Sequence, residues 1–138
     1  MVIGLCVAGA AGAEPLAATQ VEGRWVNVRH NLTLDISRCG EGWCGVEVRD
    51  GQCAKTALRI TARSAPQEAA WFDGRLALAD RGEPYMVSAT LYVREGVVRL
   101  QLLGNLGDKL ELWRRWYPLN ELMARSGPPQ CKPDATVS

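Results

Sequence analysis

The chain has 138 residues and a formal net charge of +1, with 16 Lys and Arg against 15 Asp and Glu. This length suffices for one domain with its own core but not comfortably for two. Balanced charge supplies no long-range field that would gather nucleic acid, so we expect no nucleic-acid partner.

The chain opens with an uncharged stretch, residues 1–13, that ends in small side chains before Glu14. This pattern is typical of the apolar and cleavage regions of a secretory signal, cut after Ala13, although a buried first strand is an alternative. A transmembrane anchor is not expected, because a span needs about 20 apolar residues. We therefore expect a bacterial periplasmic or secreted protein, with one domain over 20–131 and a loose tail over 132–138.

Short segments of alternating polarity follow. From Asn31 to Ser37 the apolar side chains Leu32, Leu34 and Ile36 alternate with polar ones. Such alternation predicts a strand with one buried and one wetted face, as in antiparallel sheets. The same pattern predicts an opening strand around Trp25 and further strands over 44–49, 58–61, 76–78, 87–94, 98–102 and 110–112.

The connections are short and rich in Gly, Asn and Asp, so strands that follow one another should pair. A meander of this kind loses its exposed edges only by closing. The sequence predicts an all-β fold, a roughly eight-stranded antiparallel up-and-down barrel with a short C-terminal helix. That helix is expected over 118–125, because Pro118 suits a first helical position and Leu119, Leu122 and Met123 share a helical face.

Four cysteines remain once the expected signal is removed: Cys39, Cys44, Cys53 and Cys131. An even number in an exported chain indicates two disulfides. Cys39 and Cys44 flank a hairpin turn, where opposed residues lie ~4.5–5.5 Å apart at Cα, so we expect Cys39–Cys44 and Cys53–Cys131. The rival pairing is Cys44–Cys53 with Cys39–Cys131. Zinc is not expected, because there is no CxxC pair and His30 is the single histidine.

Gly23 and Trp25 form a Gly-x-Trp motif at the opening strand, and Arg114 and Arg115 lie near the end of the expected last strand. This arrangement resembles the lipocalin and calycin barrels, in which the Trp closes one end and an Arg packs across its ring. The resemblance implies barrel closure by Trp25 with Arg114 or Arg115. A guanidinium over an indole would contribute roughly 0.5–2 kcal/mol.

A closer likeness extends over most of the mature chain. The chain resembles a family of small secreted bacterial proteins of unknown function with a lipocalin-like barrel. The residues that carry it are 23–25, 31–37, the Cys-to-Cys-Gly hairpin at 39–45, and 110–116. The resemblance brings no catalytic residues. The chain is also similar, more weakly, to periplasmic inhibitors of secreted metalloproteases, whose N-terminal trunk would here be Glu14 to Gln20.

No catalytic constellation is recognisable. His30 stands at an expected turn, and no Ser-His-Asp set can be assembled from spacing. Asp35, Glu47 and Glu111 are expected on wetted faces, which does not favour a shared cleft of paired carboxylates. We therefore predict a protein that is not an enzyme and has no cofactor and no metal.

An eight-stranded barrel is just wide enough to be filled by side chains or to hold one small ligand. The leading hypothesis is a carrier or sensor of a small hydrophobic molecule in an apolar interior. Its expected ligand-binding residues are Trp25, Leu34, Ile36, Val48, Leu78, Leu91, Leu100 and Leu112.

The alternative is an envelope protein-interaction module, such as a protease-inhibitor-like barrel, that binds its partner through a surface patch. Trp43 and Trp113 are expected to point outward, and Trp71 with Phe72 to lie in an irregular link. Exposed aromatic side chains of this kind could form such a patch. A hollow barrel would favour the carrier, and a filled barrel with exposed tryptophans the interaction module.

Overall fold

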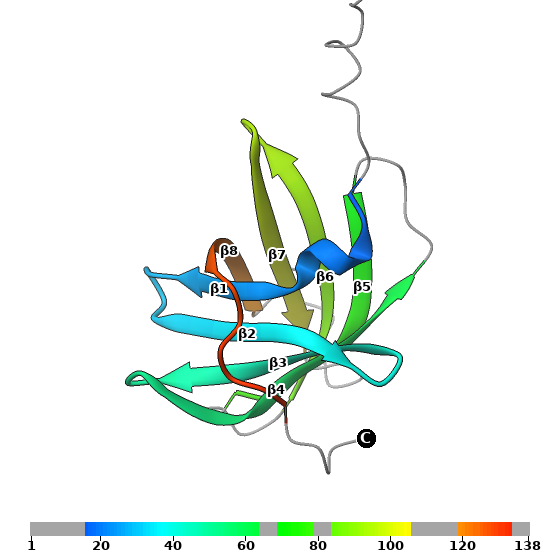
Figure 1. Cartoon of the computed structure of the whole chain (residues 1–138). Helices are drawn as coiled ribbons and strands as arrows, with labels where there is room; N and C mark the ends of the chain where they lie inside the picture. The colour runs from blue at the N-terminus through cyan, green and yellow to red at the C-terminus, as the bar shows by residue number, and fades with distance from the viewer. Residues whose placement is uncertain (1–15, 64–68, 79–83, 106–118, 134–138) are drawn as a thin grey trace, which may run out of the picture.

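The computed structural model describes residues 16–63, 69–78, 84–105 and 119–133 (Figure 1). Its elements are a 3-10 turn η1 (Ala18–Val21) and the strands β1 (Gly23–Asn27), β2 (Leu32–Cys39), β3 (Gly42–Arg49), β4 (Gln52–Arg63), β5 (Ala69–Leu76), β6 (Tyr85–Arg94), β7 (Val97–Asn105) and β8 (Leu119–Gly127). Each strand pairs with the next, and β1 pairs antiparallel with β8, so the sheet is a closed up-and-down barrel. The predicted all-β fold, an eight-stranded antiparallel up-and-down barrel, is confirmed. Among the described residues no helix is long and apolar enough to span a membrane.

The opening strands show how the inner face is built. Trp25 lies opposite Leu34, and Gly23 opposite Ile36, so these residues share the inner side of the pleat. The fully buried large side chains, most of which continue this inner face around the barrel, are Trp25, Phe72, Leu34, Ile36, Leu58, Ile60, Leu76, Leu91, Leu100, Leu102, Leu119 and Met123.

The expected C-terminal helix is wrong, because residues Leu119–Gly127 form β8, which pairs with both β7 and β1. Leu119, Glu121 and Met123 are buried and alternate with exposed neighbours. Because Glu121 is charged and faces inward, the apolar side chains of this segment do not alternate strictly, and their spacing resembles that of a helix. As a strand the segment closes the barrel and gains backbone hydrogen bonds on two sides. The strand expected over 110–112 lies outside the described residues.

Two other local expectations are also wrong. In β3 the inward residues are Trp43, Gly45 and Glu47, since Glu47 lies opposite Leu34 and Gly45 opposite Ile36. Val46 and Val48 therefore face outward, and an error of one residue in phase exchanges the two faces of a strand. The segment that contains Trp71 belongs to β5 and is not an irregular link.

Both predicted disulfides are confirmed. Cys39 and Cys44 are joined across the β2–β3 hairpin with a Cα–Cα distance of 5.7 Å. Cys53, at the start of β4, is joined to Cys131, with a Cα–Cα distance of 5.6 Å. The segment after β8 crosses the outer side of β1, β2 and β3 to reach this bond (Figure 1).

Candidate functional site

The barrel interior is filled around the residues expected to bind a ligand. Trp25, Leu34, Ile36, Leu91 and Leu100 have no accessible surface. A side chain with no accessible surface has no water-sized space beside it, so protein atoms fill the interior around these residues.

The other three residues that were expected to line the interior do not all lie there. Leu78 is buried, with 7% of its surface exposed. Val48 is half-buried on the outer face, opposite Cys53, which corrects its expected inward position. Leu112 lies outside the described residues.

One end of the barrel is closed by Trp25 and η1. The indole Nε1 of Trp25 donates a hydrogen bond of 2.8 Å to the Val21 carbonyl. The guanidinium that covers the ring belongs to Arg125 of β8, 4.8 Å from the ring centroid, and it also donates to the Gln20 carbonyl. Burial lowers the pKa of Arg125. The expected closing pair of aromatic and arginine is thus present, but with an arginine from β8. Arg114 and Arg115 lie outside the described residues.

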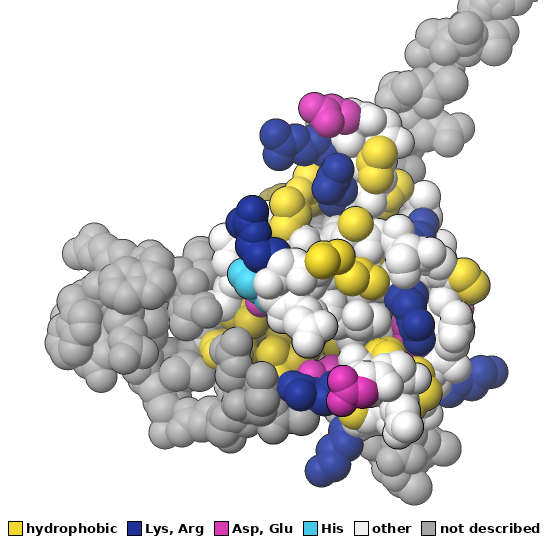
Figure 2. All heavy atoms as spheres, turned by 90° about the vertical axis from the view of Figure 1, so that its left-hand side faces the viewer, with side chains coloured by type: hydrophobic (Ala, Val, Ile, Leu, Met, Phe, Trp, Pro, Cys, Tyr) yellow, Lys and Arg dark blue, Asp and Glu magenta, His cyan; other side chains and the backbone are white. Residues whose placement is uncertain are grey.

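Two carboxylates point inward at the opposite end, which faces the viewer in Figure 2. Glu121 of β8 accepts hydrogen bonds from Asn27 Nδ2 at 2.7 Å and from His30 Nδ1 at 2.8 Å. Glu47 of β3 accepts one from Arg49 Nε at 2.8 Å. Both side chains are almost fully buried, which corrects the expectation of a wetted Glu47. Each carboxylate has its own donor, so this end of the barrel is held together by satisfied polar groups.

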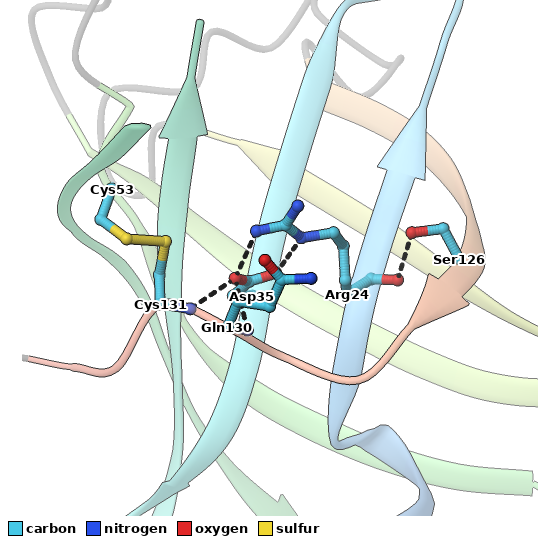
Figure 3. A network of polar contacts seen from close by, with 6 residues as sticks. All are labelled: Arg24, Asp35, Cys53, Ser126, Gln130 and Cys131. Atoms are coloured by element: carbon cyan, nitrogen blue, oxygen red, sulfur yellow. Dashed lines mark hydrogen bonds and ion pairs between the residues drawn. A yellow bond between two sulfur atoms is a disulfide. The ribbon is translucent and has the colours of Figure 1, made fainter. Parts of the chain in front are cut away.

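A third buried carboxylate, on the outer face, anchors the segment that follows β8, residues 128–133, which we call the C-terminal tail (Figure 3). Asp35 of β2 forms a two-point ion pair with Arg24, from Arg24 Nε to Oδ1 at 2.7 Å and from Nη2 to Oδ2 at 2.9 Å. Its Oδ2 also accepts hydrogen bonds from the backbone N–H groups of Gln130 at 2.9 Å and Cys131 at 2.7 Å. Because the tail covers it, Asp35 has no accessible surface, which overturns its expected wetted position.

The environment of Asp35 shifts its ionisation. Burial raises the pKa of the carboxyl group, but the hydrogen bonds from Arg24, Cys131 and Gln130 and the charge of Arg24 outweigh burial, so the pKa lies below its usual value. The same ion pair raises the pKa of Arg24. Asp35 is therefore a charged structural group whose hydrogen-bonding capacity is already used.

The outer face of β3 to β7 carries two adjoining pockets. The first has a volume of about 560 Å³ and lies beside the Cys39–Cys44 hairpin, where Arg59 lines it. The second, also about 560 Å³, is lined by Arg75, Met86 and Leu103 among others. Asp73 and Gly74 line both pockets. A third pocket, of about 470 Å³, lies beneath the C-terminal tail.

Gly74 of β5 lies where the two pockets adjoin. A Cβ atom at this position would stand 1.8 Å from the backbone oxygen of Arg59. Only a residue without a side chain permits so close an approach of β4 and β5.

Aromatic side chains on the outer face are fewer than expected. Trp43 is buried, with 4% of its surface exposed, and the Arg38 guanidinium lies 5.1 Å from its ring centroid. Trp71 is 37% exposed and stacks with Arg63 at 4.9 Å. Trp113 lies outside the described residues. Trp71 is thus the exposed aromatic residue that the described part of this surface offers.

Searches of protein-family models, curated proteins and solved structures find no match for this chain. The barrel architecture rests on the strand pairing, and kinship with the lipocalins or with a secreted bacterial family stays a prediction. In the described ranges, no group of three His, Cys, Asp or Glu residues is placed to hold a metal ion.

Proposed function

We propose that this protein is an extracytoplasmic binding protein that holds its ligand against the outer face of the barrel. The observation that carries the proposal is the contrast between the packed interior around Trp25 and the two adjoining pockets on β3 to β7. Binding sites are usually concave and partly apolar, as these pockets are. The two disulfides support an oxidising compartment outside the cytoplasm.

A binding role fits the buried carboxylates better than catalysis does. Asp35 is paired with Arg24, Glu47 with Arg49, and Glu121 with His30. A general base must reach a substrate proton, and these three carboxylates are at most 6% exposed and are already hydrogen-bonded to protein groups.

A small hydrophobic ligand inside the barrel is the second candidate. The apolar lining of Leu34, Ile36 and Leu100 favours it, because these side chains would surround an alkyl chain. Such a ligand would require packed side chains to move apart, at a cost comparable to that of opening a cavity. A protein partner docking at Trp71 is the alternative occupant of the outer face.

An NMR titration of the isotope-labelled protein with decanoate tests the proposal. We expect saturable shifts at the amides of Gly74, Met86 and Leu103, which line the outer pockets. Met86→Glu should abolish most of the binding, because it places a charge where 47% of an apolar side chain is now exposed. Leu122→Glu is the matched control, because Leu122 is similarly exposed, at 42%, on β8 away from these pockets.

The outer-face proposal fails if the shifts centre on the amides of Leu34 and Leu100 and binding survives Met86→Glu. That result would place the ligand inside the barrel and favour the carrier.

A further inference from the structure

Two arginines face each other across β4 and β5. Arg59 and Arg75 are direct partners in the strand register, and both are exposed. Like charges directly opposite in an antiparallel pair destabilise the sheet. Within the part of the chain that the structure describes, neither guanidinium forms an ion pair or a side-chain hydrogen bond. The register therefore places two positive charges opposite each other on the outer face, without an acidic partner among the described residues.

The position of this pair connects the two pockets. Arg59 lines the pocket beside the Cys39–Cys44 hairpin, and Arg75 lines the neighbouring pocket. The second pocket also has an apolar wall, from Met86 and Leu103. Two cations thus stand next to exposed apolar surface.

Acidic residues nearby do not cancel this positive charge. Asp73 lines both pockets, but its Oδ2 lies 3.3 Å from Arg63 Nε, so its charge is balanced by an arginine outside the pair. Glu41 lies at the turn of the β2–β3 hairpin, on the rim of the first pocket. The two positive charges of Arg59 and Arg75 exceed the single negative charge of Glu41, so the junction of the pockets has a net positive charge.

We propose that Arg59 and Arg75 bind the carboxylate or phosphate headgroup of a single-chain amphiphile whose alkyl part lies against Met86 and Leu103. Guanidinium groups present planar pairs of donors that match both anions. An anion between the two arginines would remove their repulsion, and the apolar wall would accept the chain. This inference rests on the proposed function and names the ligand class for the same outer face.

Titration with decyl phosphate, decanoate, 1-decanol and inorganic phosphate, followed by NMR, tests the inference. We expect both amphiphilic anions to bind at least tenfold more tightly than 1-decanol and than inorganic phosphate. Arg59→Gln and Arg75→Gln should each reduce anion binding about tenfold and leave the weak binding of 1-decanol unchanged. Arg94→Gln is the matched control, because Arg94 is exposed at the end of β6 outside both pockets.

A second measurement separates lost binding from damaged folding. Without ligand, Arg75→Gln should raise the thermal midpoint, because it removes the like-charge contact with Arg59. A variant that is more stable yet binds anions less well cannot owe its defect to misfolding.

The results distinguish this inference from the proposed function. If 1-decanol binds the outer pockets as tightly as the anions, and Arg59→Gln changes nothing, the anion site is overturned while outer-face binding stands. If inorganic phosphate binds as tightly as decyl phosphate, the alkyl part of the inference is overturned. If the anions bind inside the barrel, both proposals fail together.

Discussion

Two cross-strand pairs on the outside of this barrel carry opposite lessons. In β1 and β2, Arg24 lies directly opposite Asp35, and the tail covers the resulting ion pair. In β4 and β5, Arg59 lies directly opposite Arg75, and both side chains are exposed. The first pair uses its charges to hold the fold together. In the second pair the charges have no partner among the described residues, and they line the pockets in which we propose that an anion binds.

The tail accounts for the difference in surroundings. It brings the backbone N–H groups of Gln130 and Cys131 to the buried carboxylate and fixes itself to β4 through Cys53. A buried charge is tolerated only when its hydrogen-bonding capacity is filled, as here. On β4 and β5 no such segment of the described chain covers Arg59 and Arg75, which line open pockets that solvent reaches.

Removing the disulfide that fixes the tail to β4 should have the largest effect on stability. The Cys53–Cys131 bond closes a loop with a sequence separation of 78. On the chain-entropy model its loss in Cys53→Ala/Cys131→Ala should lower the free energy of unfolding by about 4.5 kcal/mol. Urea denaturation measures this change. The matched variant Cys39→Ala/Cys44→Ala opens a loop with a separation of only 5 and should lose about 2 kcal/mol. Equal losses would contradict the long-loop account.

Asp35→Ala should lower the free energy of unfolding by about 3–5 kcal/mol, because it leaves Arg24 and two backbone N–H groups without their shared acceptor. The control is Asp73→Ala, which breaks the exposed ion pair with Arg63 and should cost no more than about 1 kcal/mol. Chemical denaturation of both variants gives the comparison. Similar small losses in the two variants would show that the contacts of Asp35 with Arg24 and the tail do not stabilise the fold.

Acid should weaken the contacts that Asp35 makes with Arg24 and the tail. The pKa of Asp35 lies below its usual value in the folded state, so the unfolded chain binds this proton first as pH falls. The stabilisation is therefore fully present above the unfolded pKa, near 4, and is lost as pH falls through the folded pKa. Stability measured between about pH 5 and pH 2 should decline more steeply in the wild type than in Asp35→Asn. Parallel curves would contradict this assignment.

The smallest expected effect is a gain. Arg75→Glu converts the like-charge pair with Arg59 into an opposite-charge pair and should raise the free energy of unfolding by roughly 0.2–1 kcal/mol. The gain should shrink at high salt, because exposed charges are screened. A double-mutant cycle with Arg59→Ala isolates the contact. A loss of stability in Arg75→Glu would show that the two guanidinium groups do not repel in the native protein.

The sequence predicted those parts of the fold in which alternation of polarity coincides with burial. The strand around Leu34 and the closed meander followed from period-two patterning and from the need to remove sheet edges. β3 was predicted in the wrong phase because its outward residues, Val46 among them, are apolar and buried. The pattern of polar and apolar residues does not show which face of a strand is buried when charged residues face inward, as Glu47 does in β3 and Glu121 in β8.

The candidate site depends on pairings that the sequence does not contain. Arg59 and Arg75 are outward residues of separate strands, and their opposition follows from the β4–β5 register. A glycine inside a strand indicates a close backbone approach, as Gly74 shows, but no strand was predicted over the segment that contains it. The arginine over Trp25 is Arg125 of β8, and the expectation of a helix over this segment hid its place on the closing strand.

The pairing of β1 with β8 also constrains the order of folding. Trp25 lies opposite Arg125, a hundred residues later in the chain, so the first strand stays half-paired until the last one has been synthesised. Such non-local closure slows folding, because the entropy of ordering the whole loop is lost before the contact forms. The barrel therefore cannot close until the whole of β8 has been synthesised. Cys131, four residues beyond β8, meets Cys53 in its native geometry only after that closure.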